Sequence, residues 1–136
     1  MGLIVYLFFN GNCEEAMNFY RSTIGGTIES LVRYGDAPMP SADAMKEKVM
    51  HGIMMIKDTK VMCSDSGERK MVIGNNFSLS LDYKNEAEMQ KVFERLSGDG
   101  GTVTMPLQDT FWGAKFGMCT DKFGVNWMFN HDKPKS

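Results

Sequence analysis

The stretch Gly25-Gly26-Thr27-Ile28 recurs later in the chain as Gly100-Gly101-Thr102-Val103. Each Gly-Gly pair follows a segment with helical spacing of apolar residues, and each such segment follows a strand-like run. Because self-similarity over a long period indicates a repeated structural unit, we expect two half-domains with the same order of elements. Two such halves can each bury one face of a sheet and enclose a concave surface, which is a natural site for a small molecule.

The first half predicts one helix and four strands. Asn12, with Glu15 three residues after it, is typical of a helix N-cap. The apolar positions of the helix share one face, and they are Cys13, Ala16, Met17, Tyr20 and Ile24. The strands are expected at residues 3–9, 27–34, 49–56 and 60–64, with an excursion loop over residues 35–47.

The second half repeats this order after a polar seam at residues 65–76. Asn85, with Glu88 at the third position after it, predicts the second helix N-cap. The strands are expected at residues 77–83, 102–107, 114–120 and 125–130, and residues 131–136 are expected to form a polar tail. The sequence thus predicts one α+β domain of paired βαβββ modules, residues 1–66 and 75–131, with a curved mixed sheet around a cleft.

The composition of the 136-residue chain is that of an ordinary globular protein, with 43% hydrophobic and 24% charged residues. Its net charge of −2 and its scattered Lys and Arg residues give no basic stripe, so we expect no nucleic acid partner. The spacing of Cys13, Cys63 and Cys119 fits neither disulfides nor zinc, which indicates a reducing, cytoplasmic location. The apolar opening, residues 1–9, is too short for a signal peptide or a membrane span, so we expect no membrane partner.

Three segments of the chain resemble one known family. They are Tyr6-Leu7-Phe8-Phe9-Asn10-Gly11-Asn12, Thr110-Phe111-Trp112-Gly113 and Asp121-Lys122-Phe123-Gly124-Val125-Asn126-Trp127. Together they are similar to the PhnB-like branch of the vicinal oxygen chelate superfamily, which includes glyoxalase I, bleomycin-resistance proteins and dihydroxybiphenyl dioxygenases. The resemblance covers nearly the whole chain, and it implies a glyoxalase-like fold with a homodimer as the usual assembly.

Metal-dependent members of this superfamily place His or Glu ligands on the first and last strands of each module. The first strand here offers no such ligand on either face, and Met128 lies near the position of the final Glu of glyoxalases. The chain has only two histidines, His51 on a middle strand and His131 in the tail. Because a divalent ion needs donors that converge from several strands, we expect no metal ion and no other cofactor.

The resemblance also points to a cleft lined by aromatic and hydroxyl groups. Tyr6 and Trp112 are expected to stack on a ligand, although core packing explains each equally well. The long loop around Trp112 also fits a lid or a dimer contact. Ser78 and Ser80 share one strand face, and with His51 they are expected to orient the ligand through hydrogen bonds. The full set of expected ligand-binding residues is Tyr6, Phe8, His51, Ser78, Ser80, Trp112 and Met128.

These residues predict a metal-free, dimeric, cytoplasmic protein that binds an unidentified small apolar or aromatic molecule. Bleomycin-type sequestration is a special case, since an acidic protein suits a cationic drug. One alternative is an enzyme, an isomerase or a lyase, with His51 as its general base. Another is an interaction module whose exposed aromatic residues serve dimerisation alone. Some relatives are named demethylubiquinone methyltransferases, but no glycine-rich nucleotide-binding turn follows a strand here, so methyl transfer is not expected.

Overall fold

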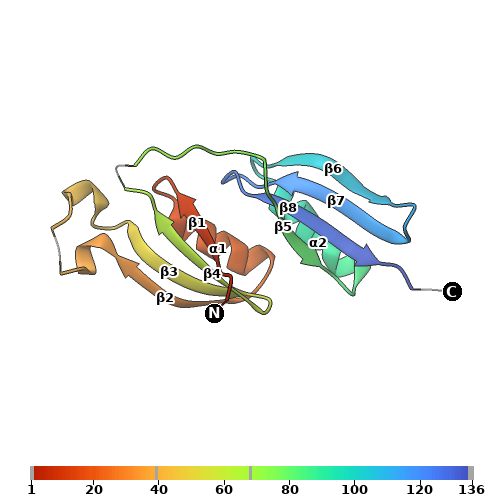
Figure 1. Ribbon diagram of the computed structural model, residues 1–136, viewed down its shortest axis with the longest axis horizontal. Helices are drawn as coiled ribbons and strands as arrows, with labels where there is room; N and C mark the ends of the chain where they lie inside the picture. Colours follow the sequence, from red (N-terminus) through yellow and green to blue (C-terminus); the bar gives the residue numbers. More distant parts are fainter. Residues whose placement is uncertain (1, 39, 68, 135–136) are drawn as a thin grey trace. The chain divides into compact units, whose positions relative to one another are not determined.

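Both halves of the chain fold in the predicted order of elements, each as four strands with one helix (Figure 1). The computed structural model describes residues 2–38, 40–67 and 69–134, and its two compact units are Met1–Val72 and Ile73–Ser136. The first unit contains β1 (Val5–Phe9), α1 (Cys13–Thr23), β2 (Thr27–Arg33), β3 (Val49–Ile56) and β4 (Thr59–Asp65), with 3₁₀ turns at Tyr34–Asp36 and Asp43–Met45. The second contains β5 (Leu79–Asp82), α2 (Glu86–Ser97), β6 (Thr102–Asp109), β7 (Ala114–Thr120) and β8 (Asn126–Asp132).

The two sheets have the same topology. Their strand orders are β1-β4-β3-β2 and β5-β8-β7-β6. In each sheet the first and last strands of the unit, β1 with β4 and β5 with β8, pair in parallel, and the other neighbours pair antiparallel. This arrangement confirms the α+β class and the paired βαβββ modules. Each sheet is open, and a curved cleft shared by both modules stays a prediction.

One helix covers one face of each sheet. The buried residues of α1 are Cys13, Ala16, Met17 and Tyr20, as the helical spacing predicts. Gly52 of β3 lets Met17 approach the sheet, because a Cβ at Gly52 would lie 2.7 Å from the Met17 sulfur. In the second unit, the Phe93 ring of α2 meets Phe129 of β8 edge-on, with 5.1 Å between ring centroids. Within the described residues, no helix has the length and apolarity to cross a membrane.

The recurring Gly-Gly pairs lie where the chain leaves each helix and enters the next strand. Gly26 has a φ of 117°, and a Cβ there would overlap the carbonyl oxygen of Met55 in β3. A Cβ at Gly101 would lie 2.7 Å from the carbonyl oxygen of Ser97 and 2.8 Å from that of Thr120 in β7. The second glycine of each pair is therefore required because two main chains approach closely in both units.

The two helices begin differently, although an asparagine precedes each. The side-chain oxygen of Asn85 accepts the Glu88 N–H at 2.8 Å, which confirms the predicted cap of α2. Asn12 occupies the predicted N-cap position of α1, but its side chain makes no capping hydrogen bond. The N–H of Cys13 instead donates to the Asp65 carboxylate at 2.9 Å. A residue from a distant strand thus replaces the local cap.

The limits of several strands also differ from the prediction. Asp65, which the sequence assigns to the polar seam, is the last residue of β4 and is only 2% exposed. His131 lies within β8 rather than in a tail, and its Nδ1 is 2.9 Å from the carbonyl oxygen of Tyr83. β5 is shorter than expected, since only Leu79–Asp82 pair with β8. Pairing with neighbouring strands extends β4 and β8, since Asp65 pairs with Phe9 of β1 and His131 pairs with Lys115 of β7.

The outer strands β2 and β6 are irregular. The pairing of β2 with β3 shifts register twice, between Ile28 and Ser30 and between Val32 and Arg33. The pairing of β6 with β7 also shifts twice, and Pro106, which has no N–H, lies inside β6. Such irregularities and prolines are typical of the edges of sheets.

Candidate functional site

The face of the first sheet opposite α1 carries aromatic residues that the sequence selects. Side chains alternate along β1, so that Leu7 and Phe9 are buried while Tyr6 and Phe8 are 40% and 44% exposed. His51 comes to the same face from β3. We call this face of β1, β4 and β3 the open face of the first unit.

Tyr6, Phe8 and His51 form one cluster on this open face. The Tyr6 hydroxyl is 3.3 Å from His51 Nδ1, and the two ring centroids are 6.0 Å apart. The rings of Tyr6 and Phe8 have centroids 4.8 Å apart and an angle of 30° between their planes. Because β4 lies between β1 and β3, the phenol and the imidazole meet over the middle of the sheet. Three of the seven predicted residues are thus brought together.

Arg69 completes this cluster, and the sequence reasoning missed it. Its guanidinium carbon lies 4.5 Å from the centroid of the Phe8 ring, which is within the range of a cation–π interaction. The Arg69 N–H donates to the carbonyl oxygen of Ser66 at 3.3 Å, so a turn directly after β4 positions the side chain. In the sequence this segment is simply polar, and no periodic signal assigns a residue in a turn to a face of a sheet.

The remaining four predicted residues belong to the second unit. Ser80 of β5 pairs with Met128 of β8. Both lie on the face opposite α2, because Trp127 and Phe129 alternate with Met128 and are buried. Ser78 precedes β5 and is half-buried. The structure thus brings Ser80 and Met128 side by side, whereas Ser78 lies outside the paired strand.

Trp112 lies in the loop between β6 and β7 and is 58% exposed. Its ring centroid is 5.0 Å from that of Phe111 and 6.2 Å from that of Phe116, in edge-on arrangements. Phe116 of β7 stands on the same face of the second sheet as Met128. Trp112 therefore reaches the rim of this face through its contact with Phe116.

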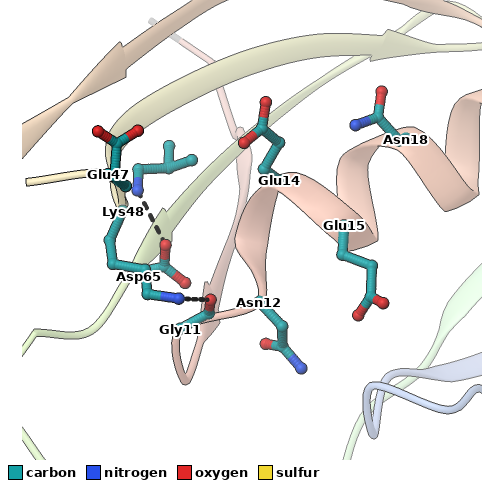
Figure 2. A pocket seen from close by; sticks show the side chains of 9 residues that line it. Gly11, Asn12, Glu14, Glu15, Asn18, Glu47, Lys48 and Asp65 are labelled. Atoms are coloured by element: carbon teal, nitrogen blue, oxygen red, sulfur yellow. Dashed lines mark hydrogen bonds between the residues drawn. The ribbon is translucent and has the colours of Figure 1, made fainter. Parts of the chain in front are cut away.

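A polar pocket that the sequence did not predict lies at the start of α1 (Figure 2). It has a volume of about 460 Å³, and its lining consists of Gly11, Asn12, Glu14, Glu15, Asn18, Glu47, Lys48, Val49 and Asp65. Asp65 accepts the N–H groups of Cys13 and Val49, both at 2.9 Å. Lys48 donates from its Nζ to the carbonyl oxygen of Gly11 at 2.8 Å. These bonds tie the start of α1 to the adjoining strands.

Glu14, at the same pocket, is also paired. Arg33 donates to its two carboxylate oxygens at 2.9 and 2.8 Å, and this pair holds the pKa of the Glu14 carboxyl below its usual value. Three charged side chains of the pocket, Glu14, Lys48 and Asp65, therefore help to hold the start of α1 against the strands.

No set of three or more His, Cys, Asp or Glu side chains arranged to hold a metal ion occurs in residues 2–38, 40–67 and 69–134. A hydrogen bond with Cys63, together with burial, raises the pKa of the Cys13 thiol, and burial raises that of Cys119 to about 12. Because the thiolate is the nucleophilic form, these two thiols are poor nucleophiles at neutral pH.

The fold places the chain in a known class. A glyoxalase/bleomycin resistance protein/dioxygenase domain from Frankia sp. EAN1pec has the same fold, with 11% sequence identity and a TM-score of 0.68 over 98% of each chain. The chain thus has the glyoxalase-like fold that the resemblance implied.

Closer relatives define the family. The family model described as 3-demethylubiquinone-9 3-methyltransferase matches residues 1–129. Protein PA1353 from Pseudomonas aeruginosa is 41% identical, with a TM-score of 0.88 over 98% of this chain and 99% of that one. A PhnB protein from Bacillus cereus is 32% identical, with a TM-score of 0.82 over 96% of this chain and 99% of that one. Protein YjdN from Escherichia coli (strain K12) is 31% identical over 96% of this chain and 95% of its own length.

The chain therefore belongs to the 3-demethylubiquinone-9 3-methyltransferase family, the PhnB-like branch of the vicinal oxygen chelate superfamily.

Proposed function

We propose that this protein binds a small aromatic or apolar molecule at the open face of the first unit, without a metal ion. The observation that carries the proposal is the cluster of Tyr6, Phe8 and His51. The rings of Tyr6 and Phe8 stay 40% and 44% exposed there, and the Tyr6 hydroxyl is hydrogen-bonded to the His51 imidazole. Exposed rings offer area for stacking, and a few convergent polar groups next to them orient a ligand.

The second unit offers groups suited to the same kind of ligand. Ser80 and Met128 present a hydroxyl and an adaptable thioether on paired strands, with Ser78 before them in the chain. The exposed rings of Phe111 and Trp112 favour a contact surface of a homodimer, which is the assembly that the resemblance implies. Light scattering on the full chain measures the assembly, and a mass of one chain at all concentrations would contradict the dimer.

Methyl transfer, which the family description names, is not part of this proposal. The turn after β1 reads Asn10-Gly11-Asn12, and the turn after β5 reads Tyr83-Lys84-Asn85. Neither is the glycine-rich turn that cradles a nucleotide at the start of a helix. The proposal therefore concerns binding.

Calorimetric titration with naphthol, a neutral aromatic probe, tests the proposal. The wild-type chain is expected to bind it, and Phe8→Ala is expected to weaken binding about tenfold or more, because a buried aromatic side chain contributes about 1.5–3 kcal/mol. Phe111→Ala is the matched control, since that ring is 97% exposed in a loop of the second unit. Absence of naphthol binding, or equal losses in both variants, would contradict the proposed site.

An enzymatic function is the second candidate, and the contact between Tyr6 and His51 favours it. A phenol 3.3 Å from the imidazole can fix the tautomer and hold the ring ready to take a proton. Such a base predicts deuterium exchange at the carbon next to the carbonyl of acetophenone, followed by NMR. His51→Ala should abolish the exchange and Tyr6→Phe should slow it, whereas unchanged exchange in His51→Ala would dismiss this candidate.

A further inference from the structure

We propose that the aromatic ligand of the open face carries an anionic group, such as a carboxylate, which the Arg69 guanidinium binds beside the Phe8 ring. This inference rests on the proposed function and adds the charge class of the ligand. It assigns a binding role to a side chain that neither the repeat nor the sequence motifs singled out.

The position of Arg69 is the first argument. Its guanidinium lies 4.5 Å from the centroid of the exposed Phe8 ring, so a ligand that stacks on this ring comes within reach of the cation. In residues 2–38, 40–67 and 69–134, no ion pair joins Arg69 to a carboxylate. A guanidinium that contacts a ring face keeps its N–H groups available, and their planar fork matches a carboxylate.

The charges on the open face are the second argument. The strand residues that share this face on β1, β4 and β3 include Lys60 and His51 but no aspartate or glutamate. Glu29, on the edge strand β2, is hydrogen-bonded to Thr27 at the end of the sheet where β3 and β4 meet in their hairpin. The strands of this face therefore place no carboxylate beside Phe8, although the whole chain has a net charge of −2.

A group of glutamate side chains of the first unit lies elsewhere, away from the open face. The glutamates of the first unit that line a pocket, Glu14, Glu15 and Glu47, gather at the start of α1 (Figure 2). None of them lies on the strands that carry Tyr6 and Phe8. An anion is therefore favoured at the open face, where complementary charge contributes to selectivity.

An unused donor in the same turn is the third argument. Ser66 Oγ is buried and makes no hydrogen bond, although most buried hydroxyl groups do. Ser66 belongs to the turn that positions Arg69, through the bond between its carbonyl oxygen and the Arg69 N–H. An anion held at Arg69 would offer acceptor oxygens near this turn, and we propose that Ser66 Oγ donates to one of them.

Two probes of the same shape test the charge class. Calorimetric titration compares naphthoate, a carboxylate, with naphthamide, its neutral counterpart. The wild-type chain is expected to bind naphthoate at least tenfold more tightly than naphthamide, because hydrogen bonds between charged partners are about twice as strong as neutral ones. Added salt should reduce this preference, since a partly exposed ion pair is screened.

Substitutions locate the effect. Arg69→Gln should bring the ratio of the two affinities close to one, and Ser66→Ala should weaken naphthoate binding by a smaller factor. Arg21→Gln is the matched control, because Arg21 lies on α1 with Asn18 as its hydrogen-bond partner. Circular dichroism melting of each variant establishes that the fold is kept.

The outcomes separate this inference from the proposed function. If naphthol binds at Phe8 but naphthoate and naphthamide bind equally, or if Arg69→Gln keeps the preference, the anionic class is refuted and the aromatic site stands. If no aromatic probe binds the wild-type chain, both proposals fail together. A preference lost in Arg69→Gln and kept in Arg21→Gln supports the assignment.

Discussion

Removal of the Asp65 carboxylate should destabilise the protein far more than removal of a surface acid. Asp65 is 2% exposed and accepts two main-chain N–H groups at 2.9 Å, from Cys13 at the start of α1 and from Val49 at the start of β3. A hydrogen bond to a charged group contributes about 1.5–3 kcal/mol. Because Asp65→Ala removes two of them, we expect a loss of about 3–6 kcal/mol in the free energy of unfolding.

Two further variants sharpen this prediction. Asp65→Asn keeps one oxygen acceptor but turns an amide N–H₂ group toward the other donor, so about half of the loss is expected. Asp43→Ala is the control, because that side chain is 94% exposed and forms only a surface ion pair with Lys46, whose contribution is at most about 1 kcal/mol.

Urea unfolding followed by far-UV circular dichroism measures these differences, since both sheets and both helices contribute to the signal. A loss below about 1 kcal/mol for Asp65→Ala, comparable to that of the Asp43 control, would refute the reasoning. Equal losses for the alanine and asparagine variants would show that the charge, rather than the number of accepted bonds, is what matters.

Three other predictions concern the helices and the core. Gly25→Ala should lower the free energy of unfolding by about 1–3 kcal/mol through backbone strain alone, since a Cβ there meets nothing within 4 Å. Gly26→Ala should lower it clearly more, because its Cβ overlaps β3, and chemical denaturation measures both losses. Burial raises the pKa of Cys119 from 9.0 to about 12, so above pH 9 the folded chain keeps a proton that the unfolded chain loses. The free energy of unfolding should therefore fall by ~1.4 kcal/mol per pH unit above pH 9. Melting curves of Cys119→Ala should show a flatter decline with pH, and an unchanged decline would contradict the assignment. Asn85→Ala should cost about 1 kcal/mol and Asn12→Ala close to nothing in the same assay, and equal costs would contradict the observed capping.

The order of the elements could be predicted because it is encoded locally. The apolar stripe of α1 repeats at the period of a helix, and Gly26 and Gly101 mark the same close approach of main chains twice. Asn85 caps α2 through a residue only three positions away. Signals of this kind lie within a few residues of the structure they specify, so a single sequence suffices to interpret them.

The features that escaped prediction depend on residues far apart in the chain. Asp65 caps α1 across 52 positions, and His131 belongs to β8 because it pairs with Lys115 of β7. Arg69 reaches Phe8 through a turn in a segment that looks like a plain polar connection. Of the predicted site, Tyr6 and Phe8 followed from the alternation of side chains along β1. The cation beside them could not be predicted in this way, because turns carry no periodicity.

The irregular outer strands limit how each sheet can be extended. The register shifts of β2 and β6, and the missing N–H of Pro106, leave those flanks unfit to receive another strand. Main-chain pairing with a further strand is then confined to β1 and β5, which form the opposite flanks. Each sheet can therefore accept one further strand, and only along the side that its first strand forms.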